Sequence, residues 1–191
     1  MIHLQNMLKG GIANKILEIT TVVLNLLYTI LYLNGNQWCY LFGILGPLAF
    51  IVLCYRNKLY AEPILQMCYI AFAIYGWMNL GDAWTILHWP TSQHILYILI
   101  GIIASLFSGY TFRKLTEAKL PYVDSVITVF GIIATWMMVN YVHENWLYFM
   151  FINALSIYVY LKRKLFFGAA LFVLYLLMSI DGYFELKIFY S

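Results

Sequence analysis

Long apolar segments follow one another along almost the whole chain, separated by short polar or charged stretches. Each segment approaches the roughly 20 residues that an α-helix needs to cross a bilayer. The apolar runs are continuous and do not alternate with polar residues, which argues against a transmembrane β-barrel. The pattern predicts seven transmembrane helices, over residues 17–34, 38–55, 63–81, 94–110, 123–140, 146–161 and 165–184.

The composition agrees with a chain that lies in lipid. Of its 191 residues, 64% are hydrophobic and 10% are charged, whereas a soluble globular protein carries about 25% charge. Cys39, Cys54 and Cys68 lie inside apolar segments, where isolated thiols act as small apolar fillers and not as disulfide partners or zinc ligands. Residues 1–15 lack an apolar core followed by a small-residue cleavage site, so no cleavable signal peptide is expected.

The net charge of +3 is informative through its distribution along the chain and does not indicate a nucleic-acid-binding patch. With seven spans, the N-terminus lies on the same side as the second, fourth and sixth loops. That side holds ten of the eleven Lys and Arg residues, and Lys187 alone lies on the other side. Because cytoplasmic loops are enriched in Lys and Arg, the N-terminus is predicted to be cytoplasmic and the C-terminus external.

Two long stretches of the chain resemble each other. Trp38 is matched by Trp146, and after a two-residue gap five more landmarks recur in the same order. These landmarks are Lys58, Leu59, Leu65, Tyr69 and Gly76, matched by Lys164, Leu165, Leu171, Tyr175 and Gly182. Within one transmembrane domain over 1–191, the match predicts three-helix repeats at 17–81 and 123–184, joined by a linker helix at 94–110. The linker makes the repeats parallel, as in transporters that bind substrate between the repeats near mid-membrane.

One face of the third span combines an amide with aromatic and small residues. At helical spacing it carries Gln66, Tyr69, Ala73, Gly76 and Trp77. The same face of the seventh span carries Phe172, Tyr175, Ser179, Gly182 and Tyr183. The small residues suit helix packing and the terminal aromatics suit interface anchoring, but both also suit a ligand site. The carboxamide of Gln66 is harder to explain by packing, because an amide in an apolar run needs a hydrogen-bond partner.

Asn153 lies near the middle of the sixth span, where its amide either joins a neighbouring helix, worth about 1 kcal/mol, or binds a substrate. Its counterpart in the first repeat is apolar, which favours binding. Aromatic residues reach 19%, and aromatic faces hold flat or cationic rings well. Asp181, near the external end of the last span, could attract such a cation or simply reach interfacial water.

The remaining polar residues indicate no further chemistry. Glu18 and Asp124 lie at the starts of the two repeats, where acidic residues compensate helix dipoles, and no acid lies clearly mid-span to couple transport to an ion. Asp82, His88 and His94 are expected in or beside a solvated external loop. The chain has no Gly-rich phosphate loop and no nucleophile with an ordered base, so neither enzymatic activity nor a metal or cofactor is expected.

Four short segments resemble the PnuC family of bacterial vitamin transporters, and the resemblance extends over nearly the whole chain. They are "LYAEPILQMCYIAFAIYGW" (59–77), "LPYVDS" (120–125), "ENWLYFMFINALS" (144–156) and the closing glycine at Gly182. The resemblance implies parallel three-helix repeats joined by a linker helix, as in SWEET-type sugar transporters, in a bacterial inner-membrane protein. It also implies a facilitator, often trimeric, for vitamin precursors that lack a phosphate and that a cytoplasmic vitamin kinase then traps.

Family members carry nicotinamide riboside, thiamine or riboflavin. The Leu65–Gln66 and Ile152–Asn153 pairs resemble those of nicotinamide riboside carriers, so import of nicotinamide riboside is expected. The family pattern Tyr-Gly-Trp-x-x-Trp ends here in Leu80, which keeps thiamine and riboflavin open. The expected substrate-binding residues are Gln66, Tyr69, Tyr75, Trp77, Trp136, Asn153, Tyr175 and Asp181. A membrane subunit or receptor whose polar residues only join helices is an alternative of a different class.

Overall fold

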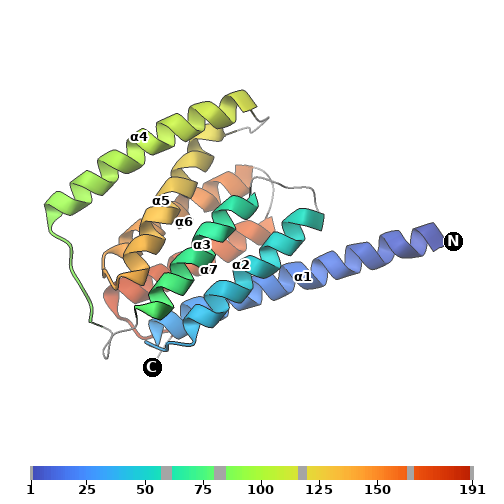
Figure 1. Cartoon of the computed structure of the whole chain (residues 1–191), viewed down its shortest axis with the longest axis horizontal. Helices are drawn as coiled ribbons and strands as arrows, with labels where there is room; N and C mark the ends of the chain where they lie inside the picture. Colours follow the sequence, from blue (N-terminus) through green and yellow to red (C-terminus); the bar gives the residue numbers. More distant parts are fainter. Residues whose placement is uncertain (1, 57–61, 80–84, 116–119, 163–165, 190–191) are drawn as a thin grey trace. The chain divides into compact units, whose positions relative to one another are not determined.

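The chain folds into helices throughout its described part (Figure 1). The computed structural model describes residues 2–56, 62–79, 85–115, 120–162 and 166–189, which form seven helices and no extended strand. The helices are α1 (Ile2–Leu33), α2 (Cys39–Arg56), α3 (Glu62–Met78), α4 (Thr91–Leu115), α5 (Pro121–Val139), α6 (Asn145–Lys162) and α7 (Phe166–Phe184). The predicted all-helical fold with seven helices is confirmed.

The helix ends differ from the prediction mainly in α1 and α4. The first helix begins at Ile2, well before the apolar segment, because helix continues through the polar N-terminal residues. The fourth runs from Thr91 to Leu115 and is longer than predicted at both ends. Polar residues can continue a helix as long as their backbone stays helical. Hydropathy therefore marks the apolar centre of a helix more reliably than its ends.

Not every predicted span is long and apolar enough to cross a membrane on those criteria alone. Among the described residues, three helical segments meet them: Lys15–Leu33, Thr91–Lys114 and Pro121–Val139. Three more segments are apolar but shorter: Cys39–Val52, Leu65–Met78 and Gly168–Phe184. Helix α6 is in neither set: it begins with an amide, carries a second one at its centre and contains three tyrosines.

The chain divides into two compact units, with the boundary between residues 83 and 84. In unit 1, α1 packs against α2 and α2 packs against α3. In unit 2, α5 packs against α6 and α6 against α7, while α4 lies along α5. Each unit therefore contains three helices that pack in order of sequence, and unit 2 contains α4 in addition.

The turn between α1 and α2 in unit 1 and the turn between α5 and α6 in unit 2 have the same pattern of backbone hydrogen bonds. Each turn contains a residue with positive φ, Gly35 (62°) in unit 1 and Tyr141 (57°) in unit 2. The amide of the next residue donates to the carbonyl five residues earlier, over 2.9 Å from Asn36 and 3.0 Å from Val142. Corresponding residues are 106 positions apart, as are the first residues of α2 and α6, Cys39 and Asn145.

Glycine contacts give the same spacing and correct the sequence match. A Cβ on Gly182 would lie 2.5 Å from the ring of Trp146, and a Cβ on Gly76 would overlap the ring of Tyr40. The counterpart of Trp146 is therefore Tyr40, and the predicted pairing with Trp38 was wrong by two residues. The exposures agree, since Trp146 is 6% exposed and Trp38 is 55% exposed. The sequence match paired two residues because both are tryptophans. In the structure, the first residues of α2 and α6 and the glycine contacts show which residues correspond.

A cluster of buried hydrophobic residues in unit 2 centres on α5 and α6. Trp89 and Tyr97, which flank the start of α4, pack against it. The cluster consists of Phe130, Ile133, Ala134, Met137, Val142, Tyr148 and Ile152. It therefore fixes the chain segment before α4 against the turn between α5 and α6.

Candidate functional site

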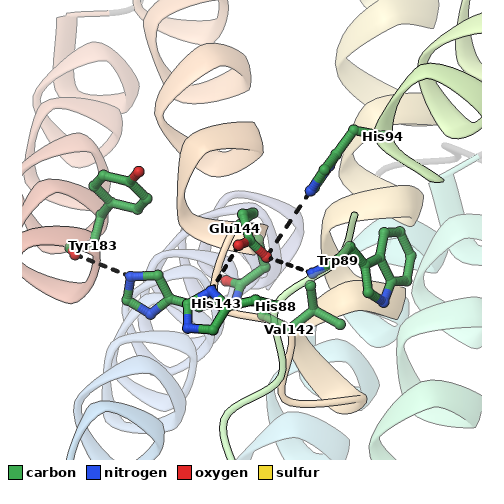
Figure 2. A network of polar contacts seen from close by, with 8 residues as sticks. His88, Trp89, His94, Val142, His143, Glu144 and Tyr183 are labelled. Carbon is green, nitrogen blue, oxygen red and sulfur yellow. Dashed lines mark hydrogen bonds and ion pairs between the residues drawn. The ribbon is translucent and has the colours of Figure 1, made fainter. Parts of the chain in front are cut away.

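A polar network in unit 2 joins this segment to the α5–α6 turn (Figure 2). Glu144, the last residue before α6, directs its carboxylate at three groups. Oε1 lies 2.8 Å from Nδ1 of His88, and Oε2 accepts a hydrogen bond of 3.3 Å from the backbone amide of Trp89. Oε2 also lies 4.0 Å from Nε2 of His94. One carboxylate thus holds the end of the connection that precedes α4.

Backbone hydrogen bonds reinforce this attachment. The amide of Leu87 donates to the carbonyl of Tyr141 (2.9 Å), and the amide of His143 donates to the carbonyl of Leu87 (2.8 Å). The ring of His143 in turn reaches the carbonyl of Tyr183 at the end of α7, with Nε2 at 3.1 Å (Figure 2). We call Leu87, His88, Trp89, His143 and Glu144 the loop clamp.

The clamp changes the expectation for the loop histidines. The His88 side chain is 68% exposed, as expected for a loop, but it is paired with Glu144. His94 is only 18% exposed, and its Nδ1 lies 3.0 Å from the hydroxyl of Tyr148, so it is not a solvated residue. Asp82 lies outside the described residues. No three His, Cys, Asp or Glu side chains in the described ranges are placed to hold a metal ion.

The clamp also determines the ionisation of Glu144. Burial opposes the charged form, but the hydrogen bonds from His88 and from the amide of Trp89 outweigh burial and lower the pKa below its ordinary value of 4.5. Glu144 is therefore a carboxylate at neutral pH. The negative charge strengthens both hydrogen bonds, because bonds to an ionised acceptor are stronger than neutral ones.

Asn153 lies at the centre of α6 and pairs with α7. Its Nδ2 donates to Oγ of Ser179 (3.2 Å), and that hydroxyl donates to the carbonyl of Tyr175 (2.7 Å). Asn153 is 7% exposed and Ser179 is 3% exposed. Among the described residues, the Asn153 side chain forms no second hydrogen bond. Since a carboxamide offers two donors and an acceptor oxygen, most of its hydrogen-bonding capacity is unused.

The predicted residues of α3 lie along one helix, as expected. Gln66 and Tyr69 are partly buried, and the Gln66 side chain forms no hydrogen bond within the described part of the chain. Tyr75 and Trp77, near the end of the helix, are each 37% exposed. The Trp77 ring meets the Trp38 ring edge to face, with 6.3 Å between ring centroids.

The remaining predicted residues divide between two roles. Trp136 on α5 and Tyr175 on α7 are partly buried aromatics. Asp181 is fully buried, and its two carboxylate oxygens accept hydrogen bonds from the backbone amides of Ile188 (3.0 Å) and Phe189 (2.9 Å). Asp181 therefore anchors the segment that follows α7.

The comparisons with known proteins agree with this fold. The sequence model of the family described as "Nicotinamide mononucleotide transporter" matches residues 15–187. The chain belongs to this family. It is 21% identical over 174 residues to the nicotinamide riboside transporter PnuC of Escherichia coli K12 and to that of Shigella flexneri. The alignment covers 75% of this chain and 73% of each relative.

A solved structure described as the crystal structure of the vitamin B3 transporter PnuC has the same fold. The TM-score is 0.71 and the identity 21%, over 96% of this chain and 85% of the other. The PnuC resemblance read from the sequence is confirmed, and the family consists of transporters and not of enzymes. Together with the apolar helices, it makes the chain a multi-pass membrane protein.

This PnuC-family chain carries one candidate that the sequence reasoning did not single out. Asn25 lies at the centre of the apolar segment Lys15–Leu33 of α1 and is partly buried. Its carboxamide oxygen lies 2.6 Å from the position that a Cβ on Gly46 would take. The signal was present in the sequence as an amide within "TTVVLNLLYTIL", but the repeat comparison began after this helix.

Proposed function

We propose that the protein imports nicotinamide riboside by facilitated diffusion. The observation that carries the proposal is Asn153, a buried carboxamide at the centre of a membrane helix with most of its hydrogen bonds unused. An amide that lacks hydrogen-bond partners inside a membrane protein costs free energy, because no water is present to replace them. A polar substrate would supply the missing partners. Nicotinamide riboside offers a carboxamide and ribose hydroxyls, which match an amide donor and acceptor.

The distribution of basic residues favours a nucleoside over a nucleotide. The chain contains no Lys or Arg in 16–55, 59–112, 120–161 or 165–186, which include all the apolar segments. A phosphate dianion that crosses the membrane would need cationic partners along its path. A riboside carries no phosphate, so this absence does not obstruct it.

Aromatic side chains suit the other part of the substrate. Trp77 and Tyr75 on α3 and Trp136 and Tyr175 in unit 2 supply ring faces. A pyridinium ring stacks on such faces and gains cation–π attraction, about 0.5–2 kcal/mol per contact. Gln66 and Tyr69 complete the proposed contacts. We assign Asp181 an anchoring role, because its two oxygens already accept backbone hydrogen bonds.

The acidic residues support passive transport. Glu18 and Asp124 lie near the starts of their apolar segments, and Asp181 is engaged by the C-terminal segment. None of the three is a free mid-span acid able to carry a coupling ion. Net uptake would then depend on phosphorylation by a cytoplasmic vitamin kinase, which traps the product inside.

Family resemblance and charge support the wider arrangement that we propose. The protein is a homotrimer in the bacterial inner membrane, with two three-helix repeats joined by α4. Ten of eleven Lys and Arg residues fall on the side that contains the N-terminus, which places that side in the cytoplasm. The recurrence of the turn hydrogen bonds at a spacing of 106 residues supports the repeats.

Binding measurements test the substrate. Purified protein is titrated calorimetrically with nicotinamide riboside, nicotinamide mononucleotide, thiamine and riboflavin. We expect saturable binding of the riboside and weaker or no binding of the mononucleotide. Saturable binding of thiamine or riboflavin alone would overturn the substrate assignment but keep a transporter. Binding of none of the four would favour a membrane subunit or receptor in which the polar residues only join helices.

A further inference from the structure

Apart from the exposed Gln93 near the start of α4, two groups of side-chain amides can be distinguished at the ends and in the apolar segments of the described helices. At helix ends, four asparagines donate to a nearby backbone carbonyl. These bonds run from Asn34 to Ile30 (2.8 Å), Asn79 to Tyr75 (2.7 Å), Asn140 to Trp136 (2.7 Å) and Asn145 to Val142 (2.6 Å). Each bond gives the amide nitrogen of a residue at a helix end a local backbone partner, although the side-chain oxygen of Asn145 is buried without one.

The amides inside the apolar segments behave differently. Asn153 forms one hydrogen bond, and neither Gln66 nor Asn25 forms any side-chain hydrogen bond with another described residue. A carboxamide at mid-membrane without a hydrogen-bond partner costs free energy, whereas each helix-end asparagine forms at least one bond to a nearby carbonyl. Asn25 therefore belongs with the two amides already proposed to bind substrate.

The surroundings of Asn25 contain a second interruption. Its carboxamide lies over Gly46 of α2, where a Cβ would meet Oδ1 at 2.6 Å. The next residue, Pro47, lies inside α2 and has no N–H to donate to the carbonyl of Gly43. Helix α2 stays continuous from Cys39 to Arg56, so the proline leaves one backbone carbonyl without its helical donor near the Asn25 carboxamide.

Comparison of residues 106 positions apart shows which features at Asn25 are shared by both units and which are not. The hydroxyl of Thr29 donates to the backbone carbonyl of Asn25 (3.2 Å), and this bond recurs from Thr135 to the carbonyl of Gly131 (2.8 Å). The bond from the threonine hydroxyl to this carbonyl is thus present in both units, whereas the carboxamide at this position is present in unit 1 and is replaced by Gly131 in unit 2. The helix geometry at this position does not require an amide side chain.

A carboxamide nevertheless lies near mid-span in both units. In unit 2 it is Asn153 on α6, and the residue 106 positions earlier is Pro47, next to the glycine that Asn25 covers. In unit 1 the amide comes from α1 and lies over the equivalent part of α2. These two amides therefore come from different helices of their units, α1 in unit 1 and α6 in unit 2.

We propose that Asn25 is a substrate-contacting residue that hydrogen-bonds a neutral polar group of the nucleoside, either a ribose hydroxyl or the carboxamide. The inference rests on the proposed function. It extends that function by adding α1 to the helices that select the substrate. Gly46 has a positioning role, because only a residue without a side chain lets the carboxamide lie over α2 at this distance.

The test compares two substitutions of similar size on one helix. Asn25→Leu removes the amide, and we expect affinity for nicotinamide riboside to fall about tenfold, the effect of one lost hydrogen bond. Thr29→Val, one turn along, removes a hydroxyl that bonds only within its own helix, and we expect affinity to stay within about twofold. The melting temperature of Asn25→Leu should stay equal or rise, because the lost amide forms no hydrogen bond with another residue that the structure describes.

Two further ligands identify the group that is contacted. Nicotinic acid riboside lacks the carboxamide nitrogen, and 1-methylnicotinamide lacks the ribose. If Asn25 contacts the carboxamide, Asn25→Leu loses less affinity for nicotinic acid riboside than for the amide. If it contacts the ribose, the loss is absent for 1-methylnicotinamide.

A second variant keeps the test valid if Asn25→Leu fails to fold. Gly46→Ala displaces the carboxamide and should also weaken binding, but it should add nothing in an Asn25→Ser background. Equal affinities of wild type and Asn25→Leu, or a lowered melting temperature with unchanged affinity, would overturn the inference and assign Asn25 to packing. Absence of nucleoside binding by the wild type would instead overturn the proposed function.

Discussion

Substitution of Gly182 by alanine tests the close contact between Gly182 of α7 and the ring of Trp146 of α6. The new Cβ would lie 2.5, 2.7 and 2.8 Å from Cε2, Cδ2 and Cζ2 of Trp146. Carbon atoms in contact prefer about 3.5–4.0 Å, so the ring or the helix must move by about 1 Å. Trp146 is 6% exposed and also packs against Phe149, which leaves the ring little freedom to move.

Two effects of opposite sign determine the magnitude. Overpacking of a rigid contact destabilises by about 1–3 kcal/mol, whereas alanine in place of glycine inside a helix stabilises by about 1 kcal/mol. The overlap exceeds the gain, so we expect a net loss of about 1 kcal/mol. For a chain of this length that loss lowers the melting temperature by about 2–4 °C.

Thermal melting of detergent-purified protein, followed by tryptophan fluorescence and by size-exclusion chromatography, measures the effect of Gly182→Ala. The matched control is Trp146→Phe, alone and combined with Gly182→Ala. The smaller ring leaves a void by itself but makes room for the new methyl group, so the double variant should be more stable than the two losses predict. An increased melting temperature in Gly182→Ala, as helix propensity alone would give, would refute the close contact. Strict additivity with Trp146→Phe would refute it as well.

Three further substitutions test the site. Asn153→Leu should weaken binding of nicotinamide riboside about tenfold with little change in the melting temperature; unfolding instead would assign the amide to packing between α6 and α7. Glu144→Gln should weaken the loop clamp by about 1 kcal/mol and accelerate hydrogen exchange at the amides of Leu87 and Trp89. Because the folded pKa of Glu144 is lowered, its contribution is complete above the ordinary value of 4.5 and is lost as pH falls through the folded value. The clamp of Glu144→Gln should show no such loss, and an identical pH profile in the two proteins would contradict the assignment. Asp181→Asn should accelerate exchange at the amides of Ile188 and Phe189 without affecting riboside affinity, whereas a loss of affinity would return Asp181 to the substrate site.

The helices were predictable because continuous apolar runs have few stable alternatives in lipid. The register of the repeats was less predictable. Trp38 and Trp146 are identical and follow similar residues, yet they occupy different places, since α2 begins at Cys39 and α6 at Asn145. The decisive contact pairs Gly182 with Trp146 and Gly76 with Tyr40, and a Trp-to-Tyr exchange hides it from comparison by identity.

The sequence shows which polar residues interrupt an apolar run, as Asn153 and Gln66 do, and their role in substrate binding stays a prediction. The hydrogen bonds of Asp181 were not predictable, because its partners are backbone amides seven and eight residues further along the chain. No side-chain pattern encodes such a bond. His94 shows the same limit, because its burial depends on Tyr148, which is more than 50 residues away in the sequence.

The comparison of the two units suggests how a substrate site can form on a repeated architecture. Features that recur at a spacing of 106 residues are local ones: the turn with positive φ, the helix-end asparagine bonds, the threonine-to-carbonyl bond and the contact of a glycine with an aromatic ring. Features near mid-span do not recur, since Asn25 corresponds to Gly131 and Asn153 to Pro47. A substrate such as a nucleoside is itself asymmetric, with a ring at one end and a sugar at the other. Under the proposed function, recognition of such a substrate would favour different mid-span side chains in the two units, as at Asn25 and Asn153.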